Sequence, residues 1–269
     1  MAACTYSAVQ MTCGGDTGME TMMSRRTTLF VINSDTTDDE ITTAAEIAAA
    51  REDHLRCLLL GAVPSLPLYA YGMPSYGAVA IPDGWTDLVA DSLEKLRERG
   101  QKIEALLAQS SVSGEVNLAH CTQVEVKHHV VRAALVSDEA MFSDRLRGTP
   151  DIMREAAYGV LFLSPIALRL NGQGQQDFEH IFVAWDSSHA AASAIHAALP
   201  HLKKAKEVTI GCVDPDMRTL SDSQNPGADL AAWLSHHGCS VTVSQYPSGG
   251  LAIAKCIQNR AWELGAGLV

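Results

Sequence analysis

Carboxylate and hydroxyl side chains follow a short apolar run at two places in this chain. In the second half, the run HIFVAW (180–185) leads into Asp186, Ser187 and Ser188. In the first half, TLFVI (28–32) leads into Asn33, Ser34 and Asp35. Such groups at the end of a strand can contact a bound ligand or cap the helix that follows. Both roles stay open for Asp186 from the sequence alone.

Each of these segments is typical of the opening of a βα unit, because an alanine-rich stretch follows the polar turn. Alignment of Thr28 with His180 puts the two copies 152 positions apart and places Ser34 opposite Asp186. The duplication predicts two tandem α/β units.

Other chemistry-bearing residues have simpler explanations. Ser248-Gly249-Gly250 before a predicted helix is consistent with an anion site, but ordinary turn chemistry is the favoured explanation. His236 and His237 are expected to complement the dipole at a helix end. The sequence has no G-x-S-x-G motif, no nucleophile–base pair justified by spacing and no metal-binding cluster, so we expect no enzyme activity.

Composition restricts the class of protein further. The chain of 269 residues has 20 basic and 31 acidic residues, a net charge of −11, which argues against nucleic-acid or anionic-membrane partners. Its 47% hydrophobic content is typical of a globular protein. Seven cysteines without a C-x-x-C pair indicate reduced thiols and a cytoplasmic location. No apolar run approaches the length of a membrane span.

Hydrophobic periodicity predicts the elements of the first half. The expected strands are 27–33, 55–63, 116–121, a weak 134–136 and Gly159–Pro165 (GVLFLSP). The expected helices are 38–52, 86–109 and 124–131. A loop rich in proline and tyrosine at 64–85 either covers the sheet edge or contacts a ligand or partner.

The pattern restarts after a polar segment. Strands are expected at 180–185, 207–213 and 240–246, and helices at 188–204, 226–237 and 249–264. Leu268-Val269 should begin a further buried strand, which predicts a second domain that is truncated at its C-terminus. The domain prediction is a disordered leader at 1–23, a first domain at 24–166, a linker at 167–178 and a second domain at 179–269.

Several motifs resemble the universal stress protein (UspA-like) family in its tandem-domain form, over residues 24–269. They are VAWDSS, VTIGCVDPD, PGADLAAWLSHHG and PSGGLAIAKCIQNRAWELGAGLV. The resemblance implies two flavodoxin- or Rossmann-like α/β domains, each a mostly parallel sheet with helices on both faces. It also implies a degenerate first domain and an incomplete second one.

The resemblance further implies an adenine-nucleotide site at the carboxyl ends of the strands. It assigns cofactor-binding positions to Asp186, Ser187, Cys212 and Val213, with the glycine-rich phosphate loop falling after Val269. In the first domain the segment 138–144 has carboxylates where phosphates would lie, so no nucleotide is expected there. ATP is expected only in a full-length second domain.

The expected function is therefore a non-catalytic, cytoplasmic stress-response protein. The alternatives are a nucleotide hydrolase or transferase on the same doubly wound scaffold and a flavoprotein of related fold. Pairing between domains, or between two copies in a dimer, is expected through the edge strand Gly159–Pro165. Neither nucleic acid nor membrane is expected as a partner.

Overall fold

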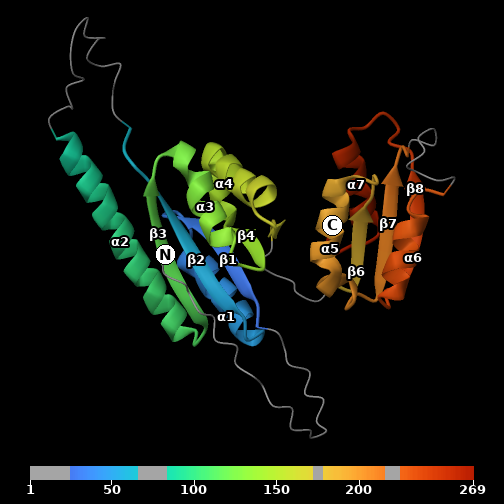
Figure 1. Ribbon diagram of the computed structural model, residues 1–269, viewed down its shortest axis with the longest axis horizontal. Helices are drawn as coiled ribbons and strands as arrows, with labels where there is room; N and C mark the ends of the chain where they lie inside the picture. Colours follow the sequence, from blue (N-terminus) through green and yellow to red (C-terminus); the bar gives the residue numbers. More distant parts are fainter. Residues whose placement is uncertain (1–24, 66–83, 172–177, 216–224) are drawn as a thin grey trace, which may run out of the picture.

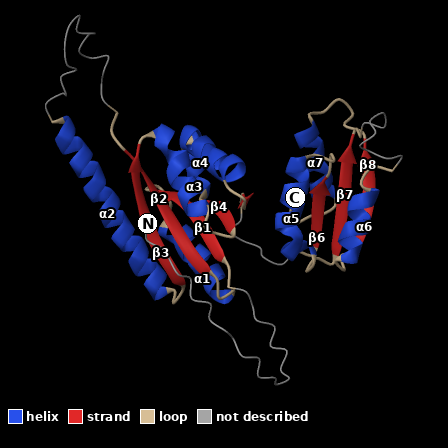
Figure 2. Ribbon diagram, viewed as in Figure 1, coloured by secondary structure: helices blue, strands red, loops and turns tan. Residues whose placement is uncertain are grey.

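The computed structural model describes residues 25–65, 84–171, 178–215 and 225–269. These residues form two lobes, each built on a parallel sheet with helices (Figures 1 and 2). The predicted leader and the central part of the loop at 64–85 lie outside the described residues. Among the described helices, none has the length and apolar content needed to cross a bilayer.

The first lobe follows an alternating order of strands and helices. Its elements are β1 (Thr27–Asn33), α1 (Asp38–Ala50), β2 (His54–Ala62), α2 (Trp85–Gln109), β3 (Ser113–Cys121), α3 (Val126–Ala134), β4 (Glu139–Phe142), α4 (Pro150–Leu163) and β5 (Ala167–Arg169). The strands form one parallel sheet in the order β3-β2-β1-β4-β5. The order reverses between β1 and β4, and ligands of doubly wound folds bind at such a reversal, beyond the carboxyl ends of the strands.

Alternating side chains of β1 bury themselves on opposite faces of this sheet. Phe30 and Ile32 pack with α1 and α2, and Leu29 and Val31 pack with α3 and α4. Helix α1 begins where the Thr37 hydroxyl accepts the N–H of Glu40, and three acidic residues occupy its first turn. The predicted helices at 38–52 and 86–109 are confirmed.

The second lobe repeats this order. Its elements are β6 (His180–Ala184), α5 (His189–Leu202), β7 (Glu207–Val213), α6 (Ala228–His236), β8 (Val241–Tyr246) and α7 (Ile253–Glu263). The sheet order is β6-β7-β8, and Leu268 forms a parallel bridge with Ile181, on the side of β6 that corresponds to β4 beside β1. The Phe182 ring lies over Gly211, where an added Cβ would stand 2.2 Å from the ring. The α/β fold class with parallel sheets is confirmed.

The repeat is offset by 151 positions, so the predicted alignment at 152 is wrong by one residue. Phe30 pairs with Cys57 on β2, and Ile181 pairs with Val208 on β7. Both side chains face the first two helices of their lobes, so Phe30 corresponds to Ile181. The helix caps agree, because Thr37 and Ser188 are also 151 apart. Asp186 therefore corresponds to Asp35, not to Ser34.

The predicted fifth strand at Gly159–Pro165 is wrong. This segment is the end of α4, which begins with Pro150 in its first turn. Gly159 packs on α3 so closely that an added Cβ would stand 2.8 Å from the Lys127 carbonyl oxygen. The apolar run alone cannot distinguish the two structures, because a buried helix segment and a buried strand have similar composition. The edge strand is β5, inside the predicted linker.

The predicted fourth strand at 134–136 is also wrong. Ala134 ends α3, and β4 lies at Glu139–Phe142. Asp138 and Glu139 are consequently at the start of β4, at the opposite edge from the ligand side of the sheet. The segment that follows β4 is a 3-10 turn at Asp144–Gly148.

Candidate functional site

The polar segment after β6 forms the carboxyl-end turn of the second lobe. Asp186 is exposed, and its Oδ1 accepts the main-chain N–H of Ser188 at 2.9 Å. Hydrogen bonds from the Ser188 side chain and main chain hold the pKa of the Asp186 carboxyl below its ordinary value. Ser187 has a positive φ of 60°. Asp186 is therefore an ionised, solvent-facing carboxylate at the end of the first strand.

The cap of α5 is Ser188, not Asp186. The Ser188 hydroxyl accepts the N–H of Ala191 at 3.1 Å, as an N-cap does. Asp186 itself accepts the Ser188 N–H and is exposed. Asp186 is therefore bonded within the turn that precedes α5 and is not the N-cap of that helix.

The end of β7 forms the neighbouring wall of this edge. Val213 is half-buried, whereas the Cys212 side chain lies in the core beneath α5 and α6. Only the main chain at Cys212 is therefore available to a ligand. The structure brings Asp186, Ser187 and Val213 to one edge and takes the Cys212 thiol away from it.

Asp214, which sequence reasoning did not single out, continues this edge. Its Oδ1 accepts the N–H of Ser248 at 3.0 Å and so links the end of β7 to the turn after β8. Hydrogen bonding from Ser248 lowers the pKa of the Asp214 carboxyl. Gly249 and Gly250 follow with positive φ angles of 62° and 84°, which explains the predicted turn. The signal in the sequence was the acidic residue directly after an apolar strand.

The equivalent edge of the first lobe is filled by its own side chains. The Thr36 hydroxyl lies 3.0 Å from Ser143 Oγ and 3.1 Å from Asn33 Oδ1, and it accepts the N–H of Asn33 at 3.1 Å. The Ser143 hydroxyl donates to Glu40 Oε2 at 2.8 Å. Thr36 is 1% exposed and Ser143 is 2% exposed. These hydrogen bonds join the segments that follow the carboxyl ends of β1 and β4, where the strand order reverses.

Two cations from α2 add to these contacts. Arg99 donates to Asp38 Oδ1 at 2.6 Å and to the carbonyl oxygen of Thr36, and Lys102 contacts Asp38 Oδ2 at 2.6 Å. Hydrogen bonds from Lys102 and Arg99 lower the pKa of the Asp38 carboxyl. The start of α1 is therefore bound to α2 through Asp38 and the carbonyl oxygen of Thr36.

The fold also forms a serine–histidine pair that the sequence did not predict. Ser92 Oγ lies 2.8 Å from His120 Nε2, with the two residues on α2 and β3. The same oxygen lies 2.8 Å from the carbonyl oxygen of Val89, which can only accept. Since a hydroxyl has one proton, Ser92 donates to Val89 and accepts from His120. This is the reverse of the arrangement that activates a serine nucleophile.

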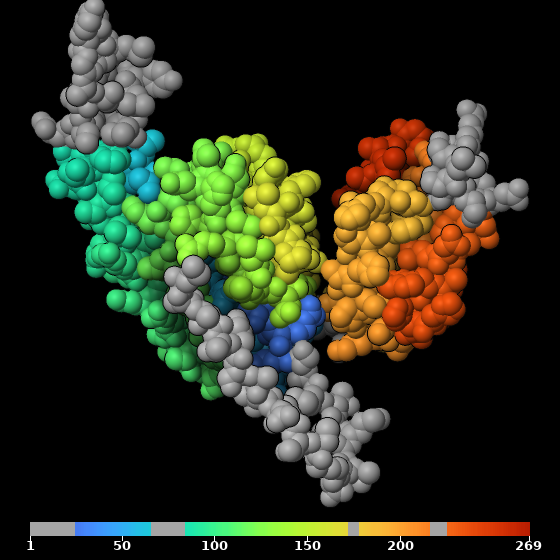
Figure 3. All heavy atoms as spheres, in the orientation of Figure 1, coloured from blue at the N-terminus to red at the C-terminus, as the bar shows by residue number. Residues whose placement is uncertain are grey.

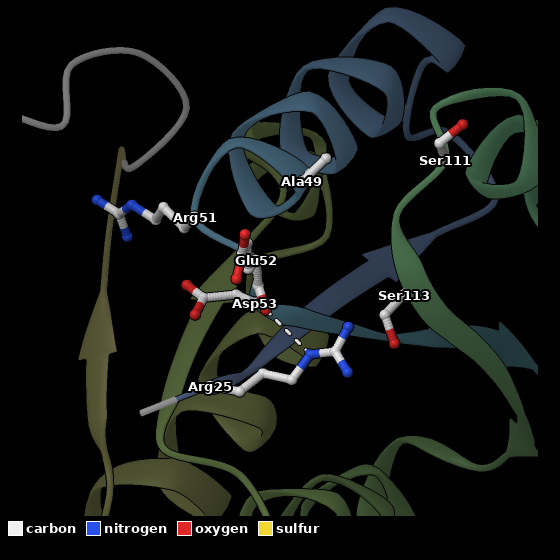
Figure 4. Close-up of a pocket in the computed structure, with 7 residues that line it drawn as sticks. All are labelled: Arg25, Ala49, Arg51, Glu52, Asp53, Ser111 and Ser113. Carbon is white, nitrogen blue, oxygen red and sulfur yellow. Dashed lines mark hydrogen bonds between the residues drawn. The ribbon is translucent and has the colours of Figure 1, made fainter. Parts of the chain in front are cut away.

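A pocket of about 350 Å³ lies at the other edge of the first sheet (Figure 4). Arg25, Glu52 and Asp53 line it together with Ser113, and Arg25 Nε donates to the Glu52 carbonyl oxygen at 3.0 Å. It lies at the amino ends of the strands, away from the edge where this fold binds ligands. Within the described residues, no three histidine, cysteine or acidic side chains are grouped to hold a metal ion.

The sequence matches no family model and no curated protein. Among solved structures, a universal stress protein from Archaeoglobus fulgidus is similar, with 18% identity, a TM-score of 0.54, and coverage of 88% of this chain and 82% of that one. The chain has the fold of a universal stress protein. This confirms, at the level of fold, the resemblance predicted from the motifs.

Two further solved structures are similar with lower TM-scores. A putative universal stress protein from Pseudomonas aeruginosa has 18% identity and a TM-score of 0.45, with 92% of this chain and 82% of that chain covered. A protein from the universal stress protein family of Burkholderia pseudomallei has 16% identity and a TM-score of 0.37, with 55% and 96% covered.

Proposed function

We propose that this chain belongs to the universal stress protein family and acts in the cytoplasm as a non-catalytic stress-response protein. The observation that carries the proposal is the strand order β3-β2-β1-β4-β5. Its part β3-β2-β1 recurs as β8-β7-β6, and Leu268 lies beside β6 as β4 lies beside β1. The fold match to the Archaeoglobus fulgidus protein spans both halves of the order, since it covers 88% of this chain.

The second lobe is the proposed nucleotide side. Asp186 presents an ionised carboxylate beside Ser187 and the main chain of Cys212 and Val213, a suitable set for the hydroxyl and base groups of adenosine. The first lobe has no comparable set of groups free for a ligand among these residues, because the Thr36 and Ser143 hydroxyls are hydrogen-bonded to each other. We therefore propose that an adenine nucleotide such as ATP binds to the second lobe and not to the first.

Calorimetry with ATP–Mg²⁺ and with adenosine tests this assignment. The motifs of residues 179–269 that carry the resemblance do not include the glycine-rich phosphate loop. We therefore expect this chain to bind ATP no more tightly than adenosine, with dissociation constants for both above the micromolar range. ATP binding tenfold tighter than adenosine would contradict the proposed lack of a phosphate site.

Paired variants locate the ligand. Asp186→Ala should abolish the weak adenosine binding, and Asp35→Ala, at the corresponding position of the first lobe, should leave it unchanged. Loss of binding in Asp35→Ala alone would move the site to the first lobe. Steady phosphate release from ATP would favour the alternative function, a nucleotide hydrolase or transferase.

We also propose that two copies of the chain pair through the exposed end of α4 in the first lobe. The edge strand is β5 (Ala167–Arg169), which lies beside α5 of the second lobe. The neighbouring end of α4 exposes Tyr158, Leu161 and Phe162, with the two aromatic rings 5.0 Å apart. An exposed apolar group of this kind favours a protein interface. The partner surface is accordingly α4, not a strand at Gly159–Pro165.

A further inference from the structure

The pocket at the amino edge of the first sheet contains a buried carboxylate. Asp53 is 7% exposed and lines this cavity of about 350 Å³. Its Oδ1 accepts the main-chain N–H of Arg26 at 3.1 Å, and within the described residues no donor is bonded to its Oδ2. A buried carboxylate oxygen that lacks a donor favours a ligand that supplies one.

A guanidinium group faces the same cavity. Arg25 Nε donates to the carbonyl oxygen of Glu52 at 3.0 Å, which fixes the direction of the side chain. In the part of the chain that the structure describes, its two Nη atoms have no partner, and Figure 4 shows the guanidinium directed toward Ser113. The Ser113 hydroxyl lies 2.9 Å from His54 Nδ1, and it can donate to a ligand when that nitrogen carries the proton. Arg25 and Ser113 together provide donors suited to a carboxylate.

Two helices end at this pocket with a polar residue in a left-handed conformation. Glu52 follows the last residue of the α1 cap with a φ of 59°, and Ser111 does the same after α2 with a φ of 51°. Glycine is the usual residue at this place, because a side chain is strained there. Both side chains line the pocket. Strained residues gather at binding sites, so the strain is consistent with a role in holding a ligand.

The formal charges of the lining cancel. Arg25 and Arg51 are positive, and Glu52 and Asp53 are negative. A simple anion would be repelled by the two carboxylates, and a simple cation by the two guanidinium groups. A zwitterion can place each of its charges beside the opposite one. The volume is at the lower end of the range for small-molecule sites, which suits a ligand of amino-acid size.

We propose that this pocket binds a free α-amino acid in its zwitterionic form. The carboxylate of the ligand lies between Arg25 and Ser113, and its ammonium group donates to the open oxygen of Asp53. The site is independent of the proposed nucleotide site, which is at the carboxyl edge of the second sheet. All of its lining residues belong to the first lobe, which Figure 3 shows as a separate mass from the second.

Calorimetry at pH 7 with three related molecules tests the need for both charges. L-Alanine has both, propionate lacks the ammonium group, and L-alaninamide lacks the carboxylate. We expect L-alanine to bind with a dissociation constant below about 10 mM, and the other two to bind at least about tenfold more weakly. Equal binding of propionate would overturn the proposal in favour of a simple anion site. Equal binding of L-alaninamide would overturn it in favour of a cation site, and so would a lack of binding by L-alanine, L-serine and L-glutamine alike.

Variants of the two charged residues locate the ligand. Arg25→Gln and Asp53→Asn should each weaken the binding of L-alanine by about tenfold or more. The asparagine keeps an oxygen for the Arg26 N–H, and circular dichroism shows whether this buried change leaves the fold intact. Arg25 is exposed, so its replacement does not disturb the core. Unchanged affinity in Arg25→Gln would overturn the proposal whatever Asp53→Asn does.

Arg97→Gln is the matched control. Arg97 is an exposed arginine of α2 that pairs with Glu94 and does not line the pocket. This variant should bind L-alanine as the wild type does, and a loss equal to that of Arg25→Gln would mean that net charge alone governs binding, against the proposal. Adenosine binding, measured on the same samples, should be the same in all three variants, so this site and the nucleotide site are tested separately.

Discussion

The Thr36 hydroxyl lies 3.0 Å from Ser143 Oγ and joins the turn after β1 to the end of β4. These two strands flank the point where the strand order reverses, which in a ligand-binding doubly wound protein is left open. In this lobe the contact is completed by Asn33 on one side and Glu40 on the other. At this edge of the first lobe, the hydroxyls of Thr36 and Ser143 are therefore both engaged in hydrogen bonds within the protein.

Replacing Thr36 with valine tests the strength of this edge. The change keeps the shape of the side chain and leaves the Asn33 N–H and the Ser143 hydroxyl without their buried partner. We expect a loss of about 1–3 kcal/mol in the free energy of unfolding, measured by urea denaturation. Asp35→Ala, one residue away and exposed, should change the free energy by less than about 0.5 kcal/mol. Equal effects of the two variants would contradict the structural role.

Gly159 tests the contact between α3 and α4. A side chain at this position meets the main-chain carbonyl of Lys127 at 2.8 Å, and a backbone atom cannot move aside. Gly159→Val should therefore destabilise the first lobe by about 1–3 kcal/mol in thermal or urea unfolding. Gly148→Ala is the control, because nothing lies within 4 Å of the added Cβ. A stable Gly159→Val protein would mean that the segment is not a helix packed on α3.

The Asp38 carboxylate predicts a pH dependence of stability. Its pKa is lowered by Lys102 and Arg99, so its contribution is complete above the unfolded value of about 3.9 and is lost as the pH falls through the folded value. Asp38→Asn should reduce the loss of stability between pH 5 and pH 2.5 in denaturant titrations. Asp39→Asn, exposed on the same turn, should keep the slope of the wild type. Because Asp38 is partly exposed, 0.5 M NaCl should weaken its effect.

Phe162 tests the proposed pairing of two copies. It is 71% exposed at the end of α4, beside Tyr158 and Leu161. A charge there would have to be buried in the interface, so Phe162→Glu should convert a dimer into a monomer in light scattering after gel filtration. Leu88→Glu, an exposed apolar residue on α2, should leave the mass unchanged. A monomeric wild type at millimolar concentration would refute the pairing.

The fold class could be predicted from the sequence because its long, strongly periodic elements had few alternatives. Helix α2 lies where periodicity predicts it, with Leu96, Ile103 and Leu107 on its buried stripe. Strand β2 also lies where it is predicted, because it is a continuous apolar run covered on both faces. Short elements were harder to locate. β4 and β5 have four and three residues, too few to show a period, so tertiary contacts alone fix their place.

The candidate site was predicted only in part. Asp186 and Val213 lie at the expected edge, but the Cys212 thiol points into the core because side chains alternate along β7. Asp214 was overlooked although it follows the strand directly. Ser92 and His120 are 28 positions apart in the chain, and Thr36 and Ser143 are 107 apart. Contacts over such separations cannot be predicted from a local sequence pattern.

The ring of Phe182 over Gly211 has a consequence for how this protein can vary. The missing side chain at 211 provides the room that the aromatic ring occupies, since any Cβ would overlap it. The two positions are therefore bound to change together: a larger residue at 211 is acceptable only with a smaller one at 182. Selection for folding from a library randomised at both positions should return pairs of near-constant combined volume.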